Sequence, residues 1–92
     1  MILLKTKNYK KSTFVLSKKN RRILSSQEIF LIENIFHPKL HTKKLKGFPG
    51  DLVYSFCITR IYRGVFRVSG ENIVLFAIGH RKDIYESLGW IF

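Results

Sequence analysis

The C-terminal half of the chain alternates between apolar and polar residues, as β-strands do when one face is buried. Residues 53–58 and 61–68 follow this period of two, and residues 73–78 are continuously apolar. A continuous run is typical of a central strand that is covered on both faces. Residues 69–72 (Ser-Gly-Glu-Asn) join the last two runs and have the composition of a hairpin loop. The pattern therefore predicts three consecutive antiparallel strands.

The N-terminal half has the pattern of a short strand followed by two helices. The apolar residues 2–4 predict a short strand over residues 1–6, and residues 8–19 predict the first helix, which Asn20-Arg21-Arg22 is expected to break. The second helix is expected to begin at Ser25, because Glu28 three residues later completes a capping box.

The second helix is expected to bury a stripe made by Ile29, Ile32 and Phe36, which Phe30 and Ile35 widen. It should end before Pro38, because the residue preceding a proline is disfavoured in the α region. Residues 82–88 predict a short last helix. The fold class is therefore α+β with the order (β)ααβββ(α), in which two N-terminal helices pack on one face of a twisted antiparallel sheet.

Charge narrows the choice of partner. The chain has 17 Lys and Arg against 6 Asp and Glu, a net charge of +11. This balance favours an anionic partner, which is a nucleic acid, an acidic protein or a membrane surface. The hydrophobic fraction of 46% is that of a globular protein and excludes a disordered basic tail.

Length and cysteine content set further limits. The 92 residues support a single domain, 1–92. Cys57 is the only cysteine, which excludes an intrachain disulfide and a cysteine-based zinc site. The start has too short an apolar run for a signal peptide, and no stretch approaches the ~20 apolar residues of a membrane span. We therefore expect the protein in the cytoplasm.

The basic residues of the strand region are candidates for binding phosphate. Alternate side chains of a strand share a face, so Arg63 and Arg67 are expected together on the open face, opposite the helix-facing core side. Each arginine can grip phosphate oxygens through two parallel hydrogen bonds. Lys43, Lys44 and Lys46 can attract a phosphate backbone without reading its sequence. The alternative for the two arginines and the three lysines is that they only keep the surface solvated. If they bind phosphate, we expect them to lie with His80-Arg81-Lys82 on one surface of the sheet.

The sharpest candidate constellation is His80, Arg81 and Tyr85. Phosphoryl transfer within RNA needs activation of the 2′-hydroxyl, charge stabilisation at phosphorus and protonation of the leaving 5′-oxygen. Arg81 suits charge stabilisation, Tyr85 can stack on a base or orient a phosphate, and His80 or a lysine can move protons. The alternatives are a surface histidine and a core tyrosine.

Other chemistries find little support in the sequence. His37 and His41 are four residues apart, but Pro38 prevents a continuous helix between them, so they do not predict a zinc pair. There is no phosphate-cradling glycine loop and no serine elbow. We expect neither a metal nor another cofactor.

The chain resembles the RelE/ParE superfamily of bacterial toxins from type II toxin–antitoxin systems. The match covers roughly residues 34–86 and, more loosely, the two helices before them. It is carried by the segments Asn34–Leu40, Lys44–Gly47, Tyr54–Phe56, Tyr62-Arg63 with Phe66, and Ile78–Arg81 followed by Asp83–Tyr85.

The resemblance implies a small α/β toxin and a cognate antitoxin that neutralises it. RelE-type members cut mRNA, typically in the ribosomal A site, without a metal and through a 2′,3′-cyclic phosphate. Carried across by position, Lys44 and Lys46 match the basic residues before the motif glycine. Arg81 matches the phosphate-binding arginine, and Tyr85 matches the tyrosine that stacks on or orients RNA. Arg63 matches the arginine of a Tyr-Arg pair with a partly structural role.

The chain departs from the family pattern at three places. Many relatives have an arginine in a Ser-x-Arg-Ile pattern, where this chain has Cys57; Arg60, three positions on, is a candidate substitute. Gly64 stands where a branched apolar residue is common. The tip, residues 90–92, is short beside relatives with a longer last helix.

Three hypotheses remain open. The first is an mRNA endonuclease that acts on the ribosome and stops translation. The second is a ParE-like protein that inhibits DNA gyrase by binding, which Cys57 favours. The third is a decayed or regulatory partner whose basic face only holds an acidic antitoxin. The candidate catalytic residues of the first are Arg81, Tyr85, Lys46, Lys44 and Arg63, with His80 as an auxiliary proton donor.

Overall fold

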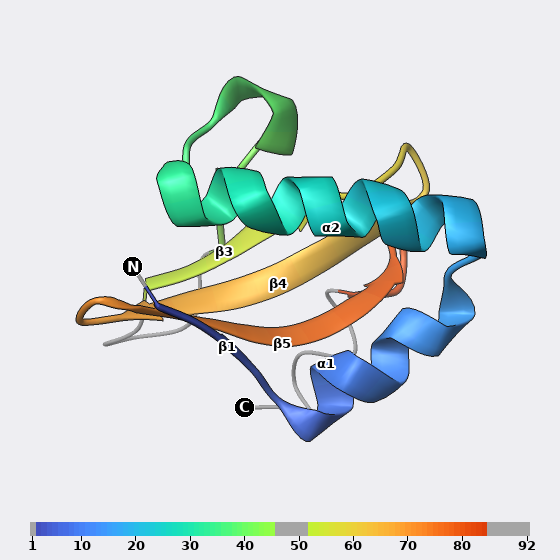
Figure 1. Ribbon diagram of the computed structural model, residues 1–92, viewed down its shortest axis with the longest axis horizontal. Helices are drawn as coiled ribbons and strands as arrows, with labels where there is room; N and C mark the ends of the chain where they lie inside the picture. The colour runs from blue at the N-terminus through green and yellow to red at the C-terminus, as the bar shows by residue number, and fades with distance from the viewer. Residues whose placement is uncertain (1, 46–51, 85–92) are drawn as a thin grey trace.

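The computed structural model describes residues 2–45 and 52–84. A single sheet and two α-helices make up this part of the chain (Figure 1). In chain order the elements are β1 (Ile2–Lys5), α1 (Lys7–Ser12), the 3₁₀ turn η1 (Thr13–Val15), α2 (Lys18–Glu33), the 3₁₀ turn η2 (Pro38–Leu40), β2 (Lys43–Lys44), β3 (Leu52–Cys57), β4 (Tyr62–Ser69) and β5 (Asn72–His80).

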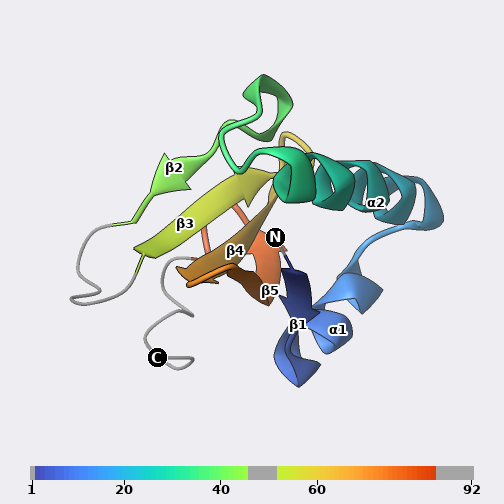
Figure 2. The same ribbon diagram turned by 60° about the vertical axis from the view of Figure 1, so that its left-hand side comes forward.

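The strands are arranged in the order β1-β5-β4-β3-β2. β2, β3, β4 and β5 pair antiparallel, whereas β1 pairs parallel with β5. The α+β fold class is confirmed, but the sheet is mixed rather than wholly antiparallel. The parallel pair results from the path of the chain. After β1 the chain forms α1 and α2 and then three consecutive antiparallel strands, β3, β4 and β5. The last of these, β5, lies beside β1 and runs in the same direction. Figure 2 shows β1 and β2 at opposite edges.

The two faces of the sheet have different cores. α2 covers one face (Figure 1), where Leu24 and Leu31 pack with Phe56, Phe66 and Leu75. The predicted alternation of β4 is confirmed, because Phe66 belongs to this core and Val65 does not. On the other face the buried residues are Val53, Val65, Ala77 and Ile84.

β5 carries a bulge at Phe76. Val65 of β4 pairs with Ala77, and the next residue, Phe66, pairs with Leu75, so the register between β4 and β5 shifts by one residue at Phe76. The Phe76 carbonyl accepts hydrogen bonds from Thr6 Oγ1 (3.1 Å) and Asn8 Nδ2 (3.0 Å). These bonds fix the start of α1 to β5, and the extra residue reverses which side chains face α2 beyond it.

The helix boundaries differ from the prediction. α2 begins at Lys18, after Ser17, whose hydroxyl accepts from the Asn20 N–H at 3.1 Å. The predicted capping residue Ser25 lies inside the helix and donates to the Arg21 carbonyl at 3.2 Å. Ser17 offers the same capping chemistry two turns earlier, and asparagine and arginine are tolerated well enough inside a helix for it to run through residues 20–22.

The buried stripe of α2 is only partly the one predicted: Phe30 and Ile35 pack against the main core, but the other three residues do not. Ile29 and Ile32 are 57% and 44% exposed, and Phe36 beyond the helix end is 60% exposed. Leu24, Gln27 and Leu31 face the sheet instead. The sequence pattern did not indicate this stripe, because one of the three buried positions is occupied by a polar residue, Gln27.

Gln27 joins three segments of the chain. Its Nε2 donates to the carbonyls of Lys39 (2.9 Å) and Cys57 (2.6 Å), which lie just after α2 and at the end of β3. Both carbonyls would lose this donor if the amide were removed, and a buried acceptor without a partner is costly.

We expect Gln27→Met to lower the free energy of unfolding by about 2–4 kcal/mol, because methionine has a similar volume but donates to neither carbonyl. Urea denaturation followed by circular dichroism would measure the loss. Ser25→Ala, at an exposed position of the same helix, is the control and should change stability by less than about 0.5 kcal/mol. Equal stability of Gln27→Met and the wild type would show that these two bonds are dispensable.

A buried tyrosine ties α1 to α2. The Tyr9 hydroxyl donates to Glu28 Oε2 at 2.6 Å, and Lys5 Nζ lies 3.1 Å from Glu28 Oε1. Burial, with the hydrogen bond to Glu28 and its charge, raises the pKa of the Tyr9 phenol well above its usual value, so Tyr9 stays a neutral donor. No helix in the described part of the chain is long and apolar enough to span a membrane. Most of the predicted last helix, residues 82–88, lies outside the described residues.

Candidate functional site

Arg63 lies on β4, between Cys57 of β3 and Gly79 of β5. One guanidinium nitrogen, Nη2, donates to the His41 carbonyl (3.0 Å) and to Ser55 Oγ (3.1 Å). His41 has a left-handed backbone (φ 47°). Arg63 therefore holds the segment before β2 against the sheet, as its partly structural role implied. Its Nε is buried and makes no hydrogen bond among the described residues.

The face that carries Arg63 and Arg67 is not the open surface that was expected. Val65, between the two arginines, is fully buried, and Ile84 packs on the same face. The guanidinium of Arg67 lies over the ring of Phe76, 5.2 Å from its centroid. Since four residues of a strand span roughly 13 Å, the two arginines are held apart by different partners and do not act as one pair.

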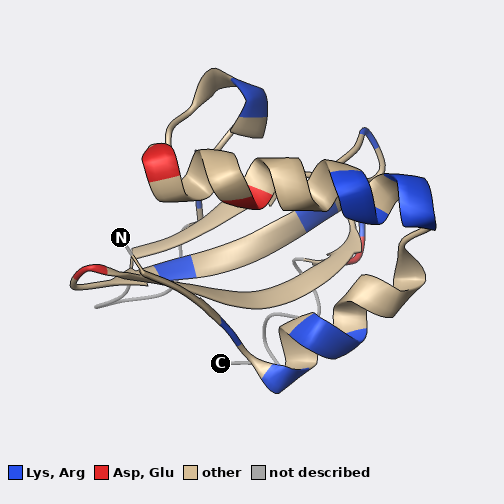
Figure 3. Cartoon of the chain, in the orientation of Figure 1, with Lys and Arg blue, Asp and Glu red and all other residues tan. Residues whose placement is uncertain are grey.

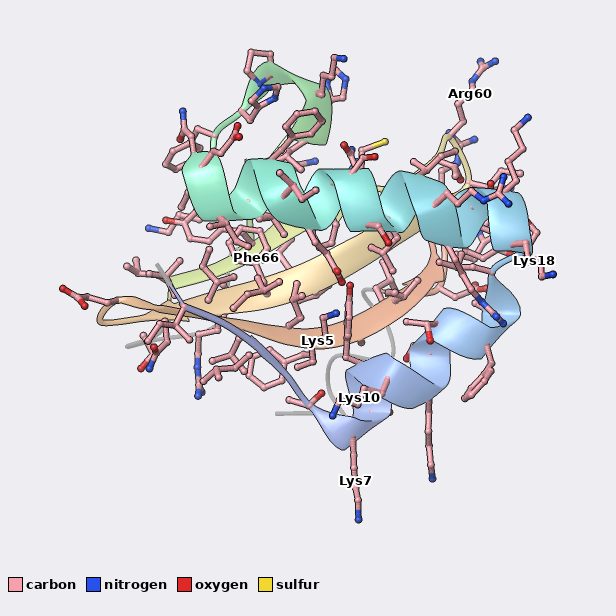
Figure 4. The ribbon with its side chains drawn as sticks, in the orientation of Figure 1. Lys5, Lys7, Lys10, Lys18, Arg60 and Phe66 are labelled. Carbon is pink, nitrogen blue, oxygen red and sulfur yellow. The ribbon has the colours of Figure 1, made fainter. Side chains whose placement is uncertain are left out.

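Arg81 lies at the end of β5, beside the loop between β3 and β4. Its backbone N–H donates to the Ile61 carbonyl at 2.7 Å, which fixes the first residue after the strand. Arg60, Ile61 and Arg81 line an open hollow of about 320 Å³. Arg60, which projects from the loop (Figure 4), is thus brought next to Arg81. The sequence pointed to Arg60 only through the arginine missing at Cys57.

His80 turns to the other side of the sheet. It pairs with Tyr62, which packs with the core under α2, and the two rings approach edge to face at 6.4 Å between centroids. His80 Nδ1 accepts from the Lys82 N–H at 3.1 Å, so the proton of the neutral ring resides on Nε2. The bulge at Phe76 is the cause: it puts Gly79 rather than Ile78 opposite Arg63, and this moves His80 from the face of Arg63 to the face of Tyr62.

Lys43 and Lys44 of the basic run also lie on opposite faces of the sheet. Lys44 pairs with Tyr54, whose ring lies in the core under α2. Lys43 pairs with Ser55, the hydroxyl partner of Arg63, and therefore lies on the face of Arg63. Lys46 and Tyr85 lie outside the described residues.

The structure thus places four of the six predicted site residues, and it does not bring them all together. Arg63 and Arg81 lie at the same end of neighbouring strands, because Arg63 is opposite Gly79, two residues before Arg81. His80 and Lys44 lie on the α2 side. Arg60 lies beside Arg81, and Lys43 lies on the face of Arg63, although neither is among the six predicted catalytic residues. Among the described residues, no three histidine, cysteine or acidic side chains come together as a metal site would require.

The arrangement supplies charge stabilisation more clearly than proton transfer. Two exposed guanidinium groups, from Arg60 and Arg81, flank a hollow in which a phosphate fits. His80 Nε2, on the neighbouring side of the strand end, is the available proton donor. These are two of the three tasks that cleavage of a phosphodiester requires, charge stabilisation and protonation of the leaving oxygen.

We expect Arg63→Lys to lower the free energy of unfolding by about 1–3 kcal/mol, because the lysine ammonium lies one bond nearer the backbone than Nη2 and does not reach both His41 and Ser55. Thermal unfolding would measure it. Ser55→Ala removes one of the two acceptors and should cost less. The two changes made together should lose less than the sum of their separate effects; strict additivity would show that the contact between Arg63 and Ser55 contributes nothing.

Solved structures with this fold are bacterial and archaeal toxins. A chain of the RelB–RelE antitoxin–toxin complex from Methanococcus jannaschii is 26% identical, with a TM-score of 0.71, over 90% of this chain and 95% of that one. The RelE–RelB complex of Pyrococcus horikoshii gives 23% identity and a TM-score of 0.69 over 87% and 93%. A YoeB/ParE toxin from Agrobacterium tumefaciens gives 20% and 0.74 over 88% and 99%.

No protein-family model matches the sequence, and no curated protein matches it. The resemblance predicted from the sequence is confirmed by the structure: the chain has the fold of RelE-, YoeB- and YafQ-type toxins along most of its length.

Proposed function

We propose that this chain, which shares the fold of the RelE/ParE superfamily, is the toxin of a toxin–antitoxin system and stops translation by cutting mRNA. The likeness to the M. jannaschii RelB–RelE complex, at 26% identity over nine-tenths of the chain, is the observation that carries the proposal. The net charge of +11 supports a polyanionic substrate.

The proposed reaction is attack of an RNA 2′-hydroxyl on the adjacent phosphate, with loss of the 5′-oxygen of the next nucleotide. Arg81 and Arg60 stabilise the charge that develops on the phosphoryl oxygens. Solvent water takes up the proton of the 2′-hydroxyl, and the imidazolium form of His80 donates a proton through Nε2 to the leaving 5′-oxygen. Lys44, Lys46 and Tyr85 remain proposed contacts to the RNA, and Arg63 is proposed to hold the site together.

Mapping of mRNA ends tests the reaction. Cells that express the wild-type chain from a tightly controlled promoter should stop protein synthesis, and primer extension should find new 5′ ends inside coding regions. Arg81→Ala should remove both effects, whereas Lys82→Ala, at the exposed neighbouring cation, should keep them. Arrested cells whose mRNA stays intact would contradict an endonuclease.

We propose an acidic antitoxin as the partner. Two of the similar structures are complexes of RelE with RelB and a third is a complex of YafQ with DinJ, and the surface of this chain is strongly cationic. The adjacent gene provides the test of this partner. If it encodes the antitoxin, its co-expression with this chain should restore growth.

A second candidate function is inhibition of DNA gyrase without cleavage. Cys57 favours it, because it lies beside Arg63 on the strand position where the nuclease pattern has an arginine. This function predicts filamentation and induction of the SOS response. Growth arrest with cleaved mRNA and a silent SOS response would exclude it.

A further inference from the structure

The turn between α1 and α2 exposes an aromatic ring among cations. Phe14 is 75% exposed and its neighbour Val15 is 57% exposed, both on η1. The turn is firmly held, because Tyr9 before it and Leu16 after it are buried in the main core. The exposed position of the Phe14 ring is therefore fixed by the packing of the residues on either side of the turn.

Arg21 of α2 is fixed beside this ring. Its Nε donates to the Thr13 carbonyl at 3.2 Å, and its guanidinium lies 5.5 Å from the centroid of the Phe14 ring. An arginine that is ordered beside an aromatic ring presents a planar, cationic edge next to a π-face. Most of the ring stays accessible, so a second flat group can stack on it.

The segment around the turn has the charge of a nucleic-acid contact. Figure 3 shows Lys and Arg positions on α1 and on the first turns of α2, on either side of η1, and Lys7 and Lys18 project from the body (Figure 4). No residue from 7 to 22 is acidic. Cations at the start of α2 are disfavoured by the helix dipole, so they do not serve the stability of the helix. The cations of this segment are Lys7, Lys10, Lys11, Lys18, Lys19, Arg21 and Arg22.

We infer that Phe14 and Arg21 form a stacking platform for an unpaired RNA base, and that the lysines around them bind the flanking phosphates. We name this surface the Phe14 platform. It shares no residue with the lining of the hollow of Arg60 and Arg81, and the inference rests on the RNA partner of the proposed function. Stacking on an aromatic ring beside cations is how proteins hold single-stranded RNA without reading its sequence. A protein partner is the less favoured occupant, because the exposed apolar surface here is small and surrounded by cations.

Fluorescence anisotropy with a fluorescein-labelled 12-nucleotide oligouridylate tests the platform. All proteins carry Arg81→Ala, so that the probe stays intact under the proposed mechanism. Phe14→Ala should weaken binding about tenfold, because stacking contributes about 1–3 kcal/mol per base. Phe14→Leu should bind as weakly as Phe14→Ala, and Phe14→Trp should bind as tightly as the parent. Ile29→Ala, an exposed apolar position elsewhere on α2, is the matched control and should leave binding unchanged.

The cations give a separate readout. Lys18→Gln with Lys19→Gln should reduce the dependence of binding on salt concentration by about one to two released ions. A 12-base-pair RNA duplex should bind Phe14→Ala and its parent equally, because its bases are already stacked.

Two results would overturn the inference. One is equal oligouridylate binding by Phe14→Ala and its parent, above all if Phe14→Ala also escapes neutralisation by the antitoxin, which would assign the turn to a protein partner. The other is full binding by Phe14→Leu, which would make the contact apolar and not a stack. The proposed function is tested separately, by translation arrest in cells carrying the wild-type chain: an inactive chain with Phe14-dependent binding would refute the function and keep the platform.

Discussion

Removal of the Arg81 guanidinium should lower the rate of RNA cleavage by about 10²–10³-fold, which is the loss typical of one missing donor to a developing oxyanion. Arg81 has the position for this task, because its backbone is fixed to Ile61 and its side chain lines the hollow with Arg60. The measurement is single-turnover cleavage of mRNA on purified programmed ribosomes with Arg81→Ala. Because Arg81 is exposed, its loss should leave the melting temperature unchanged, so reduced activity would not reflect unfolding.

Two matched variants separate charge from geometry. Arg81→Lys keeps the charge and loses the planar fork, so its rate should lie between those of Arg81→Ala and the wild type. Lys82→Ala removes a neighbouring exposed cation and should cut at close to the wild-type rate. If Lys82→Ala were as slow as Arg81→Ala, overall charge and not the position of Arg81 would explain the loss.

Arg60 is expected to replace the arginine that the family pattern has at Cys57. Arg60→Ala should then slow cleavage strongly, and Cys57→Arg in the same chain should restore part of the rate. Cys57 lies beside Arg63 and is only partly buried, so the longer side chain has a way out toward the face of Arg63. A rate that Cys57→Arg leaves unchanged would show that Arg60 works from a different place.

Strands β1, β3, β4 and β5 were predictable from the sequence, because each contains apolar residues, whereas the basic pair that forms β2 (Lys43–Lys44) gave no strand signal. The alternation seen in the sequence did not predict the burial of β3, whose Val53, Tyr54, Ser55 and Phe56 are all buried, because both faces of the sheet are covered. The face of α2 was not predictable in the same way. Its buried stripe includes Gln27, which is satisfied by carbonyls from residues 12 and 30 positions away. Hydrogen bonds of that range leave no local pattern, so the exposed isoleucines gave a misleading periodicity.

The bulge at Phe76 explains why the candidate site could be predicted only in part. Without it, strict alternation in β5 would place His80 on the face of Arg63 and Arg81 on the face of α2. With it, Gly79 pairs with Arg63 and His80 pairs with Tyr62. A bulge is set by the pairing of two strands and by acceptors such as the Phe76 carbonyl, which binds Thr6 and Asn8. The sequence of β5 alone does not reveal it.

Gly64 is the position where we expect the largest effect on stability. It lies opposite Phe56 in the ladder of β3 and β4, and the Phe56 ring fills the space that a side chain at 64 would take. An added Cβ would overlap ring carbons Cε1 and Cζ and lie 3.2 Å from Cδ1. Because the ring is fully buried in the main core, it has little room to move. This occupancy explains why the chain has glycine where branched apolar residues are common in the family it resembles.

Gly64→Ala should therefore lower the free energy of unfolding by about 3 kcal/mol, and Gly64→Val should prevent folding, since a domain of this size has only about 5–15 kcal/mol of stability. Urea denaturation would measure the first and soluble expression the second. In a Phe56→Leu background the space is partly vacated, so Gly64→Ala should cost much less there than in the wild type. Gly79→Ala is the matched control, because its Cβ would come no closer than 3.0 Å, to the terminal Cδ1 of Ile84, and would lie at ordinary contact distance from Ile84 Cβ (3.5 Å) and Cα (3.6 Å). An equal cost of Gly64→Ala in both backgrounds would mean that the Phe56 ring is not what excludes a side chain.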